Sequence, residues 1–381
     1  MNRHQRNRAL GVHGLAATLI AVASAMAPVN AQPKALDWPA LERITPDPTV
    51  QGKLVAKKSG KIAKDLSGLA CRHTPAGSPL DCLTVNDESS FAQRLTVADR
   101  ILAPGAQDND RVKLIGDNMP TSAVGKPPSL NDCPGGAGEF DEFDGEAVAF
   151  APNAAGGGAY YIAGSHGCSR NSGKARLSSF LFAQIPVAPS GALSDARLSW
   201  KLSDVLKNAT PVTANFGKSL APDKQGLNIE GIAVTGDWLR LGLRAPSVQG
   251  TAFIVSTSIA AVFDPGTTAP PATVFPLLLG PDAGIRDMTA LPDGRLLVLS
   301  GPAQDQSNVA FGIVLVTLND AATTADVKHV GWLEDFTGGG ERAKAEAITV
   351  VGSDGDALRV LVMFDGVENG GPREYRVRLP R

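Results

Sequence analysis

The sequence lacks the features that mark several large classes of protein. Its formal charge is only −2 at pH 7 and its basic residues are dispersed, which disfavours nucleic acid or an anionic membrane as the main partner. It has four cysteines and five histidines but no CxxC pair, so a zinc site is not indicated. GGGE at 338–341 has no Lys-Ser/Thr after it, and AGSHG at 163–167 lacks the spacing and helix of a nucleophile elbow. The sequence therefore contains neither a phosphate loop nor a serine-hydrolase motif.

Aromatic residues are also scarce, at 5%, whereas 41 glycines and 27 prolines supply many turn formers. Hydrophobic residues make up 43% of the 381 residues, which is enough for a substantial core. This balance predicts many short elements joined by tight turns, and it argues against a helical bundle.

The N-terminus has the order of segments found in a signal peptide. Arginines at positions 3, 6 and 8 precede an apolar run over residues 9–27, and Val29 and Ala31 stand at the −3 and −1 positions of a small-residue cleavage site. A membrane anchor is the alternative, but the run has few strongly apolar residues and no stop-transfer flank. We therefore expect a signal peptide over residues 1–31, an N-terminal extension over 32–48, and a periplasmic or secreted protein without a membrane span.

Export places the four cysteines in an oxidising compartment, where an even number predicts disulfides with three possible pairings. Cys71 and Cys82 flank the Pro/Gly-rich turn of a predicted hairpin, so we expect them to close it. Cys133 and Cys168 are then expected to pair with each other.

A short pattern recurs five times along the chain. Each copy enters through a small or acidic residue, continues as an alternating apolar run, and is followed by a turn and a second apolar strand. The copies are DLSGLACR (65–72), FDGEAVAF (143–150), NIEGIAVT (228–235), GIRDMTAL (284–291) and AKAEAITV (343–350). Repeats with roughly four strands each are typical of a β-propeller, whereas a β-sandwich would not need this repeated entry.

We therefore predict an all-β fold, a single β-propeller over residues 49–381 with an insertion at about 104–138. Five four-stranded blades are favoured, with six as the alternative. The fifth repeat ends after its third strand, and the spare strand TVQGKLVAK (49–57) is expected to complete it and close the ring. Fourth strands are expected near residues 112–115, 198–202, 274–279 and 327–333.

In a propeller, the innermost strand starts and the second strand ends at the same mouth of the central channel. The strand starts bring four carboxylates to this mouth, namely Glu146, Glu230, Asp287 and Glu346. The strand ends, together with the neighbour of Asp287, add Asp87, Glu88, His166, Arg244, Asp365 and Arg286.

Like charges in a narrow funnel repel one another, so the four carboxylates need compensation. Either they pair with Arg244, Arg286 and His166, or they bind a divalent cation, for which Ca²⁺ best suits oxygen ligands. We predict a cation at the four carboxylates, Arg244 on an anionic substrate group, and His166 as the carrier of a proton. The predicted substrate contacts are Asp87, Glu88, Arg286 and Asp365. For any one of these residues, hydrogen bonding to loop amides is an equally simple role.

The same motifs resemble the domain of unknown function 3616 family of exported propeller proteins. The resemblance covers roughly residues 60–380 and is carried by NDES (86–89), DGEAVAF (144–150), GSHG (164–167), EGIAV with GLRAP (242–246), LSGPA (299–303) and MFDG (363–366). The segment GIRDMTALPDGRLLVLSG (284–301) is also similar to one in the esterase-like phytase propeller family. The first resemblance implies no activity, and the second implies ester or phosphoester hydrolysis.

Together these features predict a metal-assisted esterase or phosphoesterase that acts on a small anionic substrate at the channel mouth. The alternative is a non-catalytic propeller that binds a ligand or a protein at the same place. We expect a monomer, a divalent cation and no organic cofactor.

Overall fold

The structure of the protein is a computed structural model that describes residues 38–380. Short gaps within this range are residues 58–59, 73, 75–76, 108–109, 131–132, 134, 137–139, 141, 171 and 339. The predicted signal peptide and its cleavage site lie outside the described residues.

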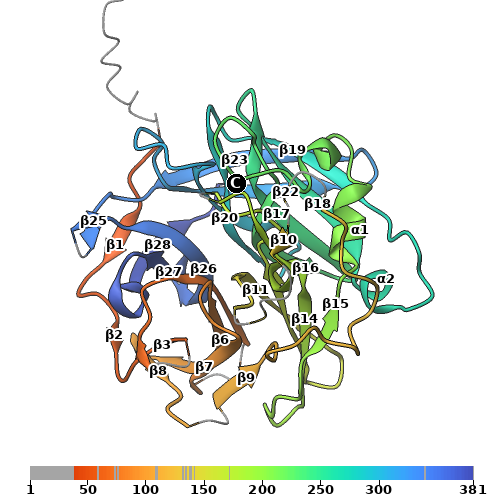
Figure 1. Cartoon of the computed structure of the whole chain (residues 1–381). Coiled ribbons are helices and arrows are strands. Elements are labelled where there is room, and N and C mark those ends of the chain that lie inside the picture. Colours follow the sequence, from red (N-terminus) through yellow and green to blue (C-terminus); the bar gives the residue numbers. More distant parts are fainter. Residues whose placement is uncertain are drawn as a thin grey trace, which may run out of the picture. The chain divides into compact units, whose positions relative to one another are not determined.

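The chain forms five large sheets, and the inner strand of each sheet contacts the inner strands of two neighbouring sheets. The inner strands are β5 (Leu66–Arg72), β11 (Gly145–Pro152), β16 (Asn228–Thr235), β20 (Ala283–Ala290) and β26 (Lys344–Asp354). Because β26 of the last sheet contacts β5 of the first, the sheets close into a ring (Figure 1). This is a five-bladed β-propeller, so the predicted fold class and the favoured blade number are confirmed.

The remaining strands of each blade follow the inner strand outwards. Blade 1 continues with β6 (Leu80–Asn86), β7 (Phe91–Ala98) and β8 (Ile101–Pro104). Blade 2 continues with β12 (Gly158–Gly164), β14 (Phe182–Val187) and β15 (Arg197–Ser199). Blade 3 continues with β17 (Trp238–Val248), β18 (Thr251–Ser258) and β19 (Thr273–Leu278). Blade 4 continues with β21 (Leu296–Pro302), β22 (Gly312–Asn319) and β23 (Thr324–Trp332), and blade 5 with β27 (Ala357–Asp365) and β28 (Arg373–Arg378).

An N-terminal strand closes the ring, although it is not the predicted one. β1 (Glu42–Ile44) pairs antiparallel with β28 and completes blade 5, as the neighbouring red and blue strands show in Figure 1. The segment predicted for this role, 49–57, contributes β2 (Thr49–Val50), which pairs parallel with β8 of blade 1. Either segment removes a free edge, so edge protection alone could not tell them apart.

The predicted insertion connects blades 1 and 2. It returns β9 (Arg111–Lys113) to β7, so blade 1 has both β8 and a strand near the predicted position 112–115. Three further sheets have two short strands each. They pair β3 (Val55–Ala56) with β4 (Lys61–Ile62), β10 (Gly135–Gly136) with β13 (Ala175–Arg176), and β24 (Thr337–Gly338) with β25 (Glu341–Arg342). The short helices are α1 (Leu202–Lys207), α2 (Ile259–Phe263) and the 3₁₀ turns η2 (Leu177–Phe180), η3 (Val212–Asn215) and η4 (Glu368–Gly370).

Glycine-containing turns set the register of the hairpins. Thr235 pairs with Trp238 across a two-residue turn whose first residue, Gly236, has a φ of 60°. Gly355 occupies the same place between β26 and β27, with a φ of 62°. A turn with positive φ at its first position matches the twist of antiparallel strands, which is why these glycines mark the hairpins in the sequence.

The hydrophobic core lies between neighbouring blades. Between blades 2 and 3, for example, Tyr161 and Phe182 belong to the same buried cluster as Leu241 and Phe253. Most central strands are covered on both faces, which explains their nearly continuous apolar sequences. Among the described residues, no helix is both long and apolar enough to cross a membrane.

Candidate functional site

Every inner strand carries a β-bulge near its first residue. At each bulge the pairing with the second strand skips one residue. The skipped residues are Ser67, Glu146, Glu230, Arg286 and Glu346. Arg286 contacts both Glu230 and Glu346, which belong to the blades on either side of its own, so these side chains meet in the central channel. The bulges therefore turn polar side chains out of the sheets towards one place.

The bulge in blade 4 corrects the alignment that the sequence suggested. Arg286, and not Asp287, occupies the position of Glu146 and Glu230. Asp287 is fully buried, accepts a hydrogen bond from the backbone N–H of Ile348 at 2.7 Å, and has a pKa raised well above its usual range by burial. A slip of one residue turns a side chain to the other face of a strand, so the fourth member of the ring is an arginine.

Two buried arginines compensate two of the three glutamates. Arg244 Nη1 lies 2.6 Å from Glu230 Oε1, Arg286 Nη1 lies 3.0 Å from Glu230 Oε2, and Arg286 Nη2 contacts Glu346 Oε1. Burial, followed by the charge of Arg244, lowers the pKa of Arg286 to about 10. Of the two predicted kinds of compensation, pairing with arginine is the one that the structure has at Glu230 and Glu346.

The anion-binding role predicted for Arg244 has to compete with these structural contacts. Only 9% of the residue is exposed. Besides binding Glu230, its Nε donates to the carbonyl of Ala303 at 3.2 Å, and its Nη2 lies 3.5 Å from Asp305 Oδ1. Arg244 is therefore first an internal counter-ion, although its side chain also borders a pocket.

Glu146 is the glutamate of the ring for which the described residues provide no ion pair. It makes no hydrogen bond or ion pair with a residue that the structure describes, and it lines the same pocket as Arg244. Burial raises the pKa of Glu146 well above its usual range, and the charges of Glu230, Asp144 and Asp87 raise it further, whereas the charge of Arg244 lowers it in part. A carboxyl group of this kind binds a proton more readily than an exposed one.

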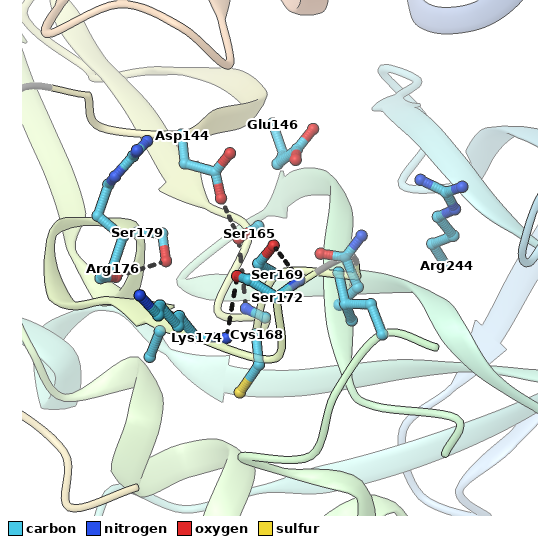
Figure 2. Close-up of a pocket in the computed structure, with 14 residues that line it drawn as sticks. Asp144, Glu146, Ser165, Cys168, Ser169, Ser172, Lys174, Arg176, Ser179 and Arg244 are labelled. Atoms are coloured by element: carbon cyan, nitrogen blue, oxygen red, sulfur yellow. Dashed lines mark hydrogen bonds between the residues drawn. The ribbon is translucent and has the colours of Figure 1, made fainter. Parts of the chain in front are cut away.

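Asp144 lies beside Glu146 and belongs to the same pocket (Figure 2). Its φ of 56° is in the left-handed region, which a residue other than glycine occupies only when its surroundings hold it there. Ser165 holds Asp144 by two hydrogen bonds: it donates its backbone N–H to the Asp144 carbonyl at 3.1 Å and its hydroxyl to Asp144 Oδ2. Burial raises the pKa of Asp144 to about 6, and the Ser165 hydrogen bond lowers it in part.

The pocket has a volume of about 370 Å³ and a polar lining. In Figure 2, Lys174 and Arg176 lie on one side of the two carboxylates and Arg244 on the other. Further polar groups on the wall are Ser165, Ser169, Ser172, Ser179 and Asn228. Arg176 is held by Glu142, whereas the exposed Lys174 has no ion pair with a described carboxylate. The pocket thus offers carboxylates inside and, at its edge, a lysine that makes no ion pair with a carboxylate in the described part of the chain.

Asn228 was not singled out by the sequence, although it opens the motif NIEGIAVT. It is only 2% exposed, and its amide nitrogen donates to Glu230 Oε1 at 2.7 Å. Its carbonyl oxygen has no hydrogen-bond partner. A polar residue two positions before a bulged glutamate is the signal that would have found it.

The structure moves His166 away from the predicted role of proton carrier. Its side chain is fully buried, packs edge-on against Phe180, and is not part of the pocket lining. Its Nδ1 lies 2.9 Å from the Gly164 carbonyl, and burial lowers its pKa to about 4. Register explains the error, because Ser165, one residue earlier, is the position equivalent to Arg244.

The predicted substrate contacts are not part of the pocket lining, although Asp87 is near enough to Glu146 to act on its pKa. Asp87, Glu88, Arg286 and Asp365 do not border the pocket. Asp87 has a pKa raised well above its usual range by burial and by the charge of Asp144. Glu88 faces Lys57 at 3.6 Å and Asp365 faces Lys344 at 3.0 Å. The structure therefore brings none of these four residues to the pocket beside Glu146.

Both predicted disulfides are present. Cys71 and Cys82 join facing positions of the first hairpin, and Cys133 and Cys168 join the insertion to blade 2, where Cys168 borders the pocket.

Among the described residues, no group of three or more His, Cys, Asp or Glu side chains is placed to hold a metal ion. The divalent cation at Glu146, Glu230, Asp287 and Glu346 stays a prediction without an assembled set of ligands.

A five-bladed propeller with a carboxylate pocket at one mouth is the class of protein that these observations define. Residues 188–374, which run from the end of blade 2 through blade 5, match the family described as "Protein of unknown function (DUF3616)". The family resemblance expected from the sequence is confirmed by this match. None of the curated proteins compared with the chain matches it.

Several solved structures are similar in fold. A GH43 β-1,3-galactosidase matches with a TM-score of 0.41 and 9% identity over 89% of this chain, which spans 63% of that enzyme. The α-L-arabinofuranosidase PaAbf62A from Podospora anserina matches with a TM-score of 0.43 and 10% identity over 91% of this chain and 99% of its own. PhoX from Pseudomonas fluorescens, solved with vanadate, matches with a TM-score of 0.40 and 8% identity over 90% and 89%. At such identities the likeness concerns the fold alone.

Proposed function

We propose that the pocket is the active site of a hydrolase that cleaves an ester or phosphoester of a small anionic substrate. Glu146 and Asp144 would be its acid–base pair. The observation that carries this proposal is the position of Glu146, a glutamate of the bulge ring that makes no direct ion pair with a described arginine and borders a pocket shared with Asp144. Carboxyl groups with raised pKa values are suited to exchanging protons near neutral pH.

The chemistry needs one carboxyl in each protonation state. The ionised member takes a proton from water as the water oxygen bonds to the carbonyl carbon or the phosphorus. The protonated member gives its proton to the leaving oxygen as the ester bond breaks, so charge and atoms balance. Lys174 at the pocket edge is available for the negative charge of the substrate. A divalent cation, if bound, would polarise the same carbonyl or phosphoryl oxygen.

The test is a hydrolysis screen with 4-nitrophenyl esters and phosphomonoesters between pH 5 and 9, with and without chelator and with metal content measured. We expect Glu146→Gln and Asp144→Asn to lower kcat by about 10²–10⁴. Glu368→Gln is the matched control, because Glu368 is exposed and faces Lys64 outside the pocket. Absence of turnover in every class, or an unchanged kcat in Glu146→Gln, would overturn the proposal.

A non-catalytic binding pocket is the second candidate. Two observations favour it: the His166 side chain is buried, and Arg244 and Arg286 form ion pairs with glutamates of the ring. Fewer side chains are therefore available to a substrate than an active site commonly has. In that case a ligand would bind and Glu146→Gln would change its affinity, but no substrate would turn over.

We further propose that the protein works outside the cytoplasm. Two disulfides support this location, because such bonds persist in oxidising compartments. Sequencing the N-terminus of the exported protein would test the predicted cleavage after residue 31.

A further inference from the structure

The carbonyl oxygen of Asn228 is a buried hydrogen-bond acceptor without a partner, on a residue that lines the pocket. Leaving such an acceptor unpaired costs the free energy of removing it from water without a hydrogen bond in return. Buried polar atoms are paired in most proteins, and exceptions call for an explanation. A ligand that donates a hydrogen bond at this point would supply one.

The amide is locked in this orientation. Its nitrogen donates to Glu230 Oε1, and the same oxygen is held by Arg244 Nη1 at 2.6 Å. Turning the amide over would place its oxygen against the Glu230 carboxylate, where two acceptors repel each other. The oxygen is therefore fixed on the side away from Glu230.

A second acceptor lies in the same pocket. Glu146 is on the inner strand next to that of Asn228, and its carboxylate is also unpaired among the described residues. The wall around them carries neutral hydroxyl groups, of which Ser169 and Ser172 are examples. This set of groups matches a ligand with several hydroxyls, each of which both donates and accepts.

We propose that the pocket binds a polyhydroxylated phosphate ester of the size of a sugar phosphate, with hydroxyl groups on Asn228 Oδ1 and Glu146 and with the phosphate at Lys174. This inference rests on the proposed function for the phosphate end, and it adds the class of the substrate. A volume of about 370 Å³ accommodates a single sugar unit and exceeds what one metal ion or one ammonium group fills. Among the residues that the structure describes, no group of three or more His, Cys, Asp or Glu side chains is placed to hold a metal ion, so the lining does not favour calcium as the occupant.

Gly167 offers a direct way to cover the Asn228 oxygen. A Cβ atom at Gly167 would lie 3.3 Å from Asn228 Oδ1 and 3.1 Å from the Leu220 side chain. The backbone of Gly167 is not in the left-handed region, so alanine is compatible with its conformation. Gly167→Ala should therefore shield the acceptor, with a shift of a few tenths of an ångström in the flexible Leu220 side chain or in the amide to relieve the close contacts.

Binding is tested with glucose 6-phosphonate, which cannot be hydrolysed, against methylphosphonate, which has no hydroxyl groups. Titration calorimetry should give a Kd at least about ten times lower for the sugar phosphonate, a difference of about 1.4 kcal/mol. Asn228→Ala and Gly167→Ala should abolish most of this difference. Asn86→Ala is the matched control, because Asn86 is also a buried asparagine with an unpaired carbonyl oxygen but lies outside the pocket.

The outcomes separate this inference from the proposed function. Hydrolysis of 4-nitrophenyl phosphate with no preference for the sugar phosphonate would overturn the inference and leave the function standing. A preference for the sugar phosphonate without hydrolysis of any ester would support the inference and overturn the proposed hydrolase function. Binding of calcium or methylammonium that is lost in Gly167→Ala, with no sugar phosphonate bound, would also overturn the inference. If Asn228→Ala unfolds, Gly167→Ala alone decides.

Discussion

Blades 2 and 3 place three residues at equivalent positions of the channel mouth, and they do so with opposite electrostatic results. The first position is the bulged residue of the inner strand, and the second lies two residues before it. The third is on the second strand: it directly follows the residue that pairs with the neighbour before the bulge. Blade 2 has Asp144, Glu146 and Ser165. Blade 3 has Asn228, Glu230 and Arg244. The glutamate is common to both blades, whereas its two neighbours differ.

The neighbours decide what the glutamate is able to do. In blade 3 an amide and a guanidinium both hold Glu230, so its charge is compensated and its position fixed. In blade 2 the amide is replaced by a second carboxylate and the guanidinium by a hydroxyl, so Glu146 makes no ion pair with a described residue. Burial raises its pKa, and the neighbouring carboxylates raise it further. The same backbone device thus builds a structural ion pair in one blade and a pair of neighbouring carboxyl groups with raised pKa values in the next.

The largest effect on stability should come from removing the buried arginine that pairs with Glu230 and Glu346. Arg286→Met would leave Glu230 and Glu346 with one arginine between them, and we expect it to lower the free energy of unfolding by about 3–5 kcal/mol. Urea unfolding followed by circular dichroism measures this change. Arg295→Met is the control, because Arg295 is only partly buried and pairs with the exposed Asp293, and it should leave the midpoint unchanged. Equal behaviour of the two variants would show that Arg286 does not compensate the ring.

A smaller effect is expected at Arg244. Arg244→Lys keeps the charge but loses the planar fork that reaches Glu230 and the Ala303 carbonyl together, so stability should fall by about 1–3 kcal/mol. Arg244 was predicted from the sequence to bind an anionic substrate group, and for that role alone Arg244→Lys would weaken anion binding without a loss of stability. Unchanged urea unfolding together with weaker phosphate binding would restore that prediction and remove the structural role argued for blade 3.

The fold was largely predictable because its signals are local. Turn glycines, alternating apolar runs and a repeated entry motif each report on a few adjacent residues, and together they predict five blades. The closing strand was misplaced because two N-terminal segments both complete a blade edge, and which blade each one joins depends on contacts distant in sequence. Both disulfides followed from the hairpin and from the even count.

The site was predictable only in part because it depends on register. Glu146, Glu230 and Glu346 were placed correctly at the strand starts, since each is the only acidic residue of its bulge. In blade 4 two polar residues follow each other, so nothing in the pattern showed that Arg286 and not Asp287 is skipped. His166 was chosen for its chemistry, whereas burial under Phe180, invisible in the sequence, excludes it from the pocket.

The smallest effect on stability should come from replacing the carboxyl groups of Asp144 and Glu146 in blade 2, and it should be a gain where the arginine variants give a loss. The pKa of Asp144 is about 6 in the folded protein, against about 3.9 for an unfolded aspartate. A carboxyl group with a raised folded-state pKa contributes stability that is fully present below about pH 4 and is lost as the pH rises through about 6. The raised pKa of Glu146 acts in the same direction.

Asp144→Asn and Glu146→Gln should therefore be more stable than the wild type at pH 8, by on the order of 1 kcal/mol, and no more stable at pH 4. The amide oxygen that Asp144→Asn introduces would still accept the Ser165 hydroxyl, so this hydrogen bond is kept while the charge is removed. Urea midpoints at pH 4, 6 and 8 measure the difference, with Glu368→Gln as an exposed control. A loss of stability at pH 8 in both variants would mean that Asp144 and Glu146 are held as compensated ions like Glu230, and the contrast between the two blades would fail. A gain confined to high pH would mean that blade 2 gives up stability in order to keep two proton-exchanging groups in the pocket.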